Sequence, residues 1–474
     1  MITRLSSYPA DTAPAMVGEK SMSRLLVACV AALALAAGAA TAHAQTGTAA
    51  KFGCGGSPPQ PPPTLTPTFS TSAGDRTNLG FECMMWQNFV YLNWPSTPGQ
   101  RGVPNGKAKF GAPGPTVWET YKTVDETFPP GGRNPGPWDG ARLLATLEKS
   151  LAQRVATGAV RRLTMTSKIS RAVLANVADH AGAIAPDILR SITQAGGGTL
   201  YDLNGKPVYY EVAMNRDQYE YIVQNGLYNA DTQATFGASN VIVLPAGPSK
   251  YGQLGAMEMK AAWKVLSDAE RKSGRFHTVP ALLPGSAVPV AVGLVGFHMF
   301  LPVSGQGIWA TFAQVDNAPV QGSPATGKYN FYNPNCTQDG KPCPVNVKDA
   351  DPGQVVQVTP DEASTPQLNA YMQNLIRQAD AKSPWQYYKI VTIQWPLNPV
   401  DIAKQAAPVN VPLPNGNPNS TTVVNAVLET FKQQPGTGCL SCHVYGSVAA
   451  AGGQSPNTAT DYSFVFGHAT APPK

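Results

Sequence analysis

Charged side chains are scarce in this chain. Asp, Glu, Lys and Arg make up 14% of its 474 residues, whereas globular proteins average about 25%. The formal net charge is +6, and the basic residues are scattered without a Lys- or Arg-rich run. This distribution gives no support to nucleic-acid binding. A mildly basic surface is compatible with an acidic redox partner protein.

Long apolar runs and several common catalytic signatures are also missing. The chain contains no P-loop, no nucleophile elbow, no H-E-x-x-H and a single C-x-x-C-H. Its apolar run over 25–35 is shorter than the roughly 20 residues of a membrane span. The run follows Arg24 and precedes Ala42-His43-Ala44, which is typical of a secretory signal cleaved after Ala44. We therefore expect export to a periplasm, with contact to the membrane only through the signal peptide.

Cysteine is rare as well. Of seven residues, Cys29 leaves with the signal and two belong to the motif described below. In an oxidising compartment the other four are most economically placed in two disulfides. The short loop from Cys336 to Cys343 could close locally, and Cys54 and Cys83 would then tie the N-terminal arm to the body. Four thiols or a four-cysteine metal site are the alternatives.

Glycine and proline, by contrast, are abundant, at 45 and 44 residues. Together with the low charge, this composition favours a loop-rich α+β protein over a helical bundle. We expect one large mixed body of short strands and helices with a C-terminal attachment segment, whose motif is described below. The expected divisions are upstream residues and signal peptide (1–44), a Pro-rich lead-in (45–75), the α+β body (76–419), and a helix with the attachment segment (420–474).

Local patterns predict the elements of this body. Apolar periodicity and turn residues indicate helices over 81–94, within 139–196, from 215 to Gly226, and over 420–434. They indicate strands over 240–245, 288–301, 307–315 and 386–397, and a hairpin over 199–214 around an Asn-Gly turn. The segment 117–128 is a short helix or strand.

The most informative motif is the C-x-x-C-H of Cys439, Cys442 and His443. Two thiols at this spacing can reach the two vinyl groups of one porphyrin, and the adjoining imidazole can ligate the iron. A zinc site is the alternative, although zinc ligands are usually more widely separated. We expect one covalent haem c with His443 as the proximal ligand. Because only 31 residues follow His443, the preceding body must supply most of the pocket.

The ligand on the distal side of the iron is less clearly marked. No methionine follows His443, which excludes the usual downstream Met ligand. His468 in the tail and His298 in an apolar strand are the candidates, although a buried His298 could instead be satisfied by a hydrogen bond. We expect His180 on the surface and His277 at a strand edge.

Polar and aromatic residues of the body offer further candidates. If 257–266 is extended, Glu258 and Lys260 share one face, with Met257 and Met259 on the other. Such a pair could contact haem propionates or act as an acid/base couple, and a surface ion pair is the alternative. Five tryptophans could fill the core, line a pocket or relay electrons: Trp86, Trp94, Trp118, Trp263 and Trp309.

On its haem motif, residues 436–447, the chain resembles the c-type cytochromes. Five body segments are similar to large, single-haem, exported "cytochrome c family" proteins of proteobacteria, namely FECMMWQNFVYLNWP, VWETYKTVDETF, MEMKAAWKVL, VGLVGFHM and WATFAQVDNAP. That family, which has no settled activity, implies the architecture and the periplasmic compartment. The terminal motif without a later methionine departs from small cytochromes c and places simple electron carriage in doubt.

Two functions follow from these patterns. The first is a periplasmic c-type haem protein that transfers electrons through one covalent haem with two protein ligands. The alternative is a haem enzyme, peroxidase- or oxygenase-like, with an open distal iron site in the α+β body. A body much larger than the roughly 100–150 residues of a usual domain favours catalysis or an additional binding role. A sensor that uses the haem as a reporter is a third option, so enzymatic activity stays open at this point.

Overall fold

A computed structural model of the chain describes residues 54, 78–140, 149–164, 198–252, 254–302, 306–358, 365–420, 422–434, 436–449 and 457–473. The signal peptide, most of the lead-in and most of the expected helical region, including His180, lie outside these residues. Phe52–Lys474 form one compact unit, so the C-terminal segment that carries the C-x-x-C-H motif belongs to the same unit as the body. None of the described helices combines the length and apolarity required to cross a membrane.

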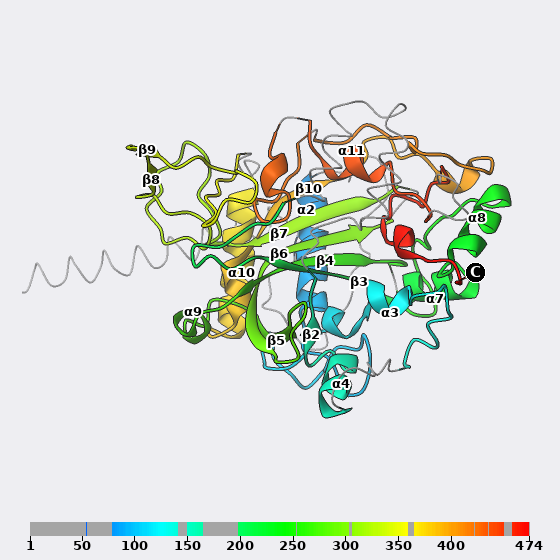
Figure 1. Cartoon of the computed structure of the whole chain (residues 1–474), viewed down its shortest axis with the longest axis horizontal. Helices are drawn as coiled ribbons and strands as arrows, with labels where there is room; N and C mark the ends of the chain where they lie inside the picture. Colours follow the sequence, from blue (N-terminus) through cyan, green and yellow to red (C-terminus); the bar gives the residue numbers. More distant parts are fainter. Residues whose placement is uncertain are drawn as a thin grey trace, which may run out of the picture. The chain divides into compact units, whose positions relative to one another are not determined.

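A mixed, curled sheet forms the centre of this unit (Figure 1). Its hydrogen-bonded order begins β1-β3-β4-β6 and then divides at β6. One branch continues through β7 to β10, and the other continues through β5 to β2. All pairs are antiparallel except β2 with β5. The strands are β1 (Lys122–Thr123), β2 (Arg161–Arg162), β3 (Tyr209–Met214), β4 (Glu258–Val265), β5 (Thr278–Leu282), β6 (Val290–Leu301), β7 (Ile308–Gln314) and β10 (Tyr388–Gln394).

Strand β6 joins the two branches of the sheet. One of its edges pairs with β4, and its other edge pairs first with β5 and then with β7. Beyond β2, Thr164 bridges Tyr210 of β3, so the strands β3-β4-β6-β5-β2 close on themselves at this end. Gly296 of β6 allows a close approach, because a Cβ there would lie 2.7 Å from a Val427 methyl group.

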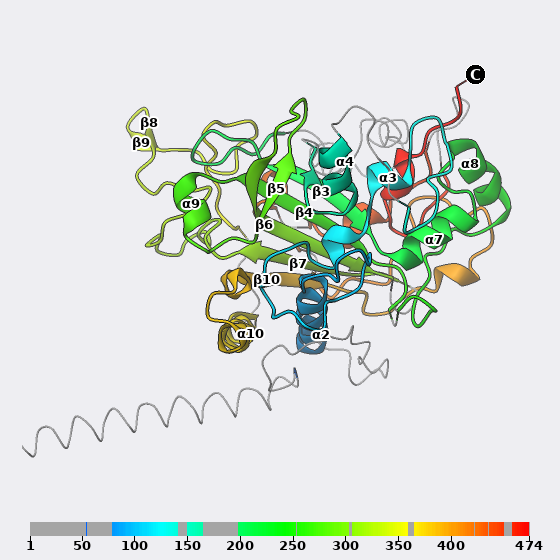
Figure 2. The ribbon, with the colours of Figure 1, turned by 90° about the horizontal axis from the view of Figure 1, so that it is seen from below.

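Two long helices cover the β7–β10 part of the sheet (Figure 2). They are α2 (Asn78–Leu92) and α10 (Thr365–Ala379). The core beneath them is aromatic: Phe89 stacks on Phe312 at 4.3 Å and meets Trp385 edge-on at 5.5 Å. The other α-helices among the described residues are α3 (Val124–Thr127), α4 (Lys149–Ala156), α7 (Arg216–Gln224), α8 (Ala230–Ser239), α9 (Asp268–Lys272) and α11 (Cys439–His443).

The α+β class and most expected elements are confirmed. The helix expected over 81–94 is α2, and the strands expected over 288–301, 307–315 and 386–397 are β6, β7 and β10. The Asn-Gly turn has Gly205 at a φ of 67°, and Tyr201 bridges Pro207 across it before β3 begins. The ambiguous segment 117–128 contains the 3₁₀ turn η1 (Trp118–Thr120), β1 and α3.

Two expected elements are wrong. The segment 420–434 is not a helix; it runs through turns to the 3₁₀ turn η5 (Thr430–Lys432). Its Asn425 side chain donates to Thr311 Oγ1 (2.7 Å) and to the Phe312 carbonyl (2.9 Å), and such tertiary bonds compete with a helix. The segment 240–245 joins no strand ladder, because Val243 N and Leu244 N donate to the side chains of Tyr221 and Asp461.

The two expected disulfides are present in the structure. Cys54 bonds to Cys83 of α2, with the Cα atoms 5.2 Å apart. Cys336 bonds to Cys343 with a Cα separation of 5.5 Å and closes the hairpin of β8 (Thr337–Gln338) and β9 (Lys341–Pro342). The four-cysteine metal site is therefore wrong.

The aromatic core generates a first prediction. Phe312 is fully buried and contacts both Phe89 and Trp86, so Phe312→Ala leaves a cavity that should lower the free energy of unfolding by about 3–5 kcal/mol. Urea unfolding followed by tryptophan fluorescence measures this loss. Val288→Ala is the control, because Val288 is 69% exposed and its truncation should change stability by less than about 0.5 kcal/mol. Equal effects of the two substitutions would contradict the assignment of this core.

Candidate haem site

The C-x-x-C-H motif forms the short helix α11 at the end of β10. Leu440 is fully buried, and its backbone N–H donates to Gln394 Oε1 of β10 at 2.6 Å. Gly438 lies so close to the same glutamine that a Cβ would come within 2.5 Å of Gln394 Nε2. Cys439 and Cys442 take no part in the two disulfides and are partly exposed. The sheet thus fixes the position of the motif.

A hydrogen bond to the backbone orients the His443 ring. Its Nδ1 lies 2.6 Å from the backbone carbonyl oxygen of Tyr462. A carbonyl oxygen can only accept, so Nδ1 carries the proton, and in the neutral imidazole Nε2 is then the basic nitrogen. Metal-binding histidines usually donate their second nitrogen in this way, which fixes the tautomer.

The loop that supplies this carbonyl is held in an unusual conformation. Asp461 and Tyr462 have φ angles of 49° and 65°, a left-handed geometry that is uncommon for residues other than glycine. The Tyr462 hydroxyl donates to the Pro414 carbonyl at 2.6 Å, and Leu244 N donates to Asp461 Oδ2 at 2.7 Å. Strain of this kind persists where surrounding contacts enforce it and is common at functional sites.

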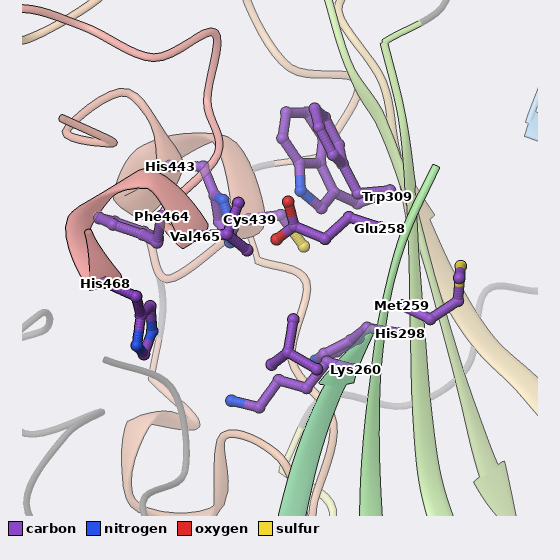
Figure 3. A pocket seen from close by; sticks show the side chains of 12 residues that line it. Glu258, Met259, Lys260, His298, Trp309, Cys439, His443, Phe464, Val465 and His468 are labelled. Carbon is purple, nitrogen blue, oxygen red and sulfur yellow. The ribbon is translucent and has the colours of Figure 1, made fainter. Parts of the chain in front are cut away.

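A cavity lies beside His443 (Figure 3). The space it spans, including its opening to solvent, is about 630 Å³. The lining residues are Val212, Glu258, Met259, Lys260, His298, Phe300, Trp309, Cys439, His443, Phe464, Val465 and His468. The motif, the C-terminal turn η6 (Val465–His468) and the sheet therefore face one space.

Strand register explains how the sheet contributes to this wall. Residues two apart on a strand share a face, and the pairing aligns such residues across β3, β4, β6 and β7. One cross-strand row is Val212, Lys260, His298 and Thr311, and the next is Met214, Glu258, Phe300 and Trp309. Six of these eight side chains line the cavity.

Glu258 and Lys260 point into the cavity rather than to the surface (Figure 3). Glu258 Oε2 accepts hydrogen bonds from Ser463 Oγ (2.6 Å) and Gln218 Nε2 (3.0 Å). Burial raises the pKa of Glu258, although these bonds and the neighbouring Lys260 act in the opposite direction. The Lys260 ammonium lies 5.4 Å from the centre of the Tyr210 ring. Glu258 and Lys260 therefore line a cavity, and the alternative of a surface ion pair is wrong.

The two candidate distal histidines line the same cavity but differ in their contacts. His298 Nε2 lies 2.9 Å and 3.2 Å from the two Glu429 carboxylate oxygens, which corresponds to the hydrogen-bonded alternative. His468 lies in η6 and packs against the body, and burial lowers its pKa, which favours the neutral imidazole. Of the other histidines described, His277 lies outside the cavity, bonded to Glu119 at 2.8 Å and stacked on Trp385.

Aromatic rings surround the His443 imidazole. Phe464, Trp309 and Phe300 lie 4.9, 5.5 and 6.5 Å from it, measured between ring centres. Trp309 is 3% exposed, and its indole N–H has no hydrogen-bond acceptor in the described part of the chain. An unsatisfied buried donor costs about 1–3 kcal/mol. Trp86, Trp94, Trp118 and Trp263, by contrast, fill the core.

These features fit a covalently attached haem. The cavity brings together one motif thiol, an imidazole whose tautomer leaves Nε2 basic, and an aromatic lining. The Trp309 N–H and the Lys260 ammonium are donors that suit carboxylates such as the haem propionates. Across the described residues, no three His, Cys, Asp or Glu side chains are grouped so as to hold a metal ion by themselves.

Comparison of the chain with models of known protein families, with curated proteins and with solved structures finds no match in any of the three.

The loop beneath His443 generates a second prediction. Burial raises the pKa of Asp461 to about 7, whereas an unfolded Asp ionises near pH 4. Between these values the folded state binds the extra proton, so its stability should fall as pH rises. Asp461→Asn removes the carboxyl and with it this pH-dependent loss of stability. Its stability relative to the unsubstituted protein should therefore improve by about 2 kcal/mol from pH 5 to pH 8, measured by urea unfolding.

The matched control for this prediction is Asp268→Asn, whose side chain is 83% exposed. Its stability difference from the unsubstituted protein should stay level over the same pH range. A level difference for Asp461→Asn as well would mean that Asp461 ionises in the folded protein near its ordinary pKa.

Proposed function

We propose that this protein is a periplasmic c-type haem protein with redox activity. The observation that carries the proposal is the 2.6 Å contact from His443 Nδ1 to the Tyr462 carbonyl, made at the wall of a cavity that Cys439 also lines. Because Nδ1 donates to this carbonyl, Nε2 is the basic nitrogen that can bind a metal ion. A histidine in this state, next to the two cysteines of a C-x-x-C-H motif, is expected of a proximal haem ligand. The likeness to exported "cytochrome c family" proteins of proteobacteria agrees with it.

In this proposal Cys439 and Cys442 hold one haem c covalently, and His443 binds its iron. Such a haem supplies one-electron redox chemistry, with a potential set by axial ligands, burial and hydrogen bonds. Phe300, Trp309 and Phe464 limit the access of water to the His443 ring. The two expected disulfides suit an oxidising compartment such as the periplasm. There a redox partner protein would exchange electrons with the haem.

The wall opposite His443 favours a second candidate function, a haem enzyme with an open distal site. Figure 3 places Lys260, His298 and His468 across the cavity from His443. His298 is hydrogen-bonded to Glu429 at 2.9 Å, so ligation through the same nitrogen would require that bond to break. Polar groups that can transfer protons are typical of catalytic sites and are more than an electron carrier requires.

The covalent attachment is tested by the motif cysteines. After expression in a periplasm with haem maturation, the double substitution Cys439→Ala, Cys442→Ala should abolish covalent haem, measured by haem staining after denaturing electrophoresis and by the pyridine haemochrome spectrum. The control is Cys336→Ala, Cys343→Ala, which removes a remote disulfide and should retain full haem content. An unsubstituted protein without covalent haem would overturn the proposed function and return zinc binding to consideration.

Carbon monoxide distinguishes the two kinds of redox protein. Because His298 is engaged by Glu429, we expect the reduced protein to bind carbon monoxide and its Soret band to shift. A low-spin spectrum that is indifferent to carbon monoxide would instead indicate two protein ligands and favour electron transfer. In that case His468→Ala should make the iron accessible to carbon monoxide, whereas His277→Ala, remote from the cavity, should not.

A further inference from the structure

Lys260 gives the wall opposite His443 a cationic character. Its Nζ atom is buried at the cavity, and His298 is its direct cross-strand neighbour on β6. A lysine ammonium offers donors and no acceptor. In the low dielectric of a partly enclosed cavity, such a charge attracts an anion far more strongly than it would in water.

The carboxylates near this wall are already engaged with other groups. Glu429 accepts from Asn425 N at 3.0 Å and contacts His298 at 2.9 Å. Glu258 accepts from Ser463 and Gln218. Glu258 lines the cavity as well, and burial raises the pKa of its carboxyl, which favours the neutral acid. Lys260 then gives a positive charge to a wall that also holds His298 and His468 (Figure 3).

We propose that Lys260, with His298 and His468 beside it, forms a binding site for a small inorganic anion on the side of the cavity opposite His443. The site rests on the proposed function, because the anion would bind at or next to the open coordination position of a haem held by His443. Val212 lies next to Lys260 on the neighbouring strand and also lines the cavity, and its apolar surface lowers the local dielectric and strengthens the electrostatic attraction.

The test compares an anionic with a neutral ligand in the haem-loaded protein. In Lys260→Gln, the ferric form should bind azide roughly 10–100-fold more weakly, since a hydrogen bond to a charged group is lost. The ferrous form should bind carbon monoxide with an affinity changed by less than about 2-fold, because that ligand is neutral. Lys260→Arg keeps the charge and should retain most of the azide affinity.

Lys272→Gln is the matched control, because it removes the same charge from an exposed position on α9. It should leave azide binding unchanged. Haem content and circular dichroism establish that each variant is folded and loaded before titration. If Lys260→Gln is not folded and loaded, Lys260→Arg is titrated in its place.

Three results would overturn the anion site. Azide affinity could be unchanged in Lys260→Gln, azide and carbon monoxide affinities could fall together, or the variant could change only the reduction potential, as expected if Lys260 binds a haem propionate. Each leaves the haem proposal intact. The absence of covalent haem from the unsubstituted protein, in contrast, is the failure of the proposed function itself and is visible before any titration.

Discussion

The pairing of β6 on both edges is the constraint on which the rest of the structure depends. Its 12 residues hold β4 on one side, and β5 and β7 in succession on the other. This arrangement fixes the register that places Lys260 beside His298, and Phe300 between Glu258 and Trp309. The same strand carries Gly296, where Val427 packs closely. The part of the cavity wall that the sheet supplies thus follows from the pairing of this one strand.

The scarcity of charge has a structural counterpart in how charged groups are used. Several are buried and paired: Arg161 with Glu211, Lys264 with Asp202, and two histidines with Glu119 and Glu429. Removing one partner from such a buried pair is strongly destabilising, whereas the intact pair contributes little net stability. These pairs therefore favour one arrangement of the sheet over others.

Sequence reasoning identified local features and failed where tertiary contacts decide. The C-x-x-C-H motif, the alternation that gives Glu258 and Lys260 one face, and three long strands follow from local patterns. The register between strands does not follow from local patterns, so the position of Trp309 beside the motif was not predictable. Its spacing of two residues from Thr311 indicates only that the two side chains share a face of the strand. The helix expected over 420–434 failed because Asn425 bonds to β7. The contact of the Tyr462 carbonyl with His443 was not predictable either, because a backbone carbonyl is common to all residues and no side chain marks it.

The packing of the C-terminal segment bears on how such a protein can change in evolution. Asn425 and Val427 belong to the core of the body, the motif is anchored on Gln394, and the carbonyl beneath His443 comes from a loop that Leu244 and Pro414 hold in place. The C-x-x-C-H motif therefore could not be exchanged between chains without losing the contacts that position it. Recombination would have to carry the sheet, the strained loop and the motif together, so gene fusion would be confined to positions outside this unit.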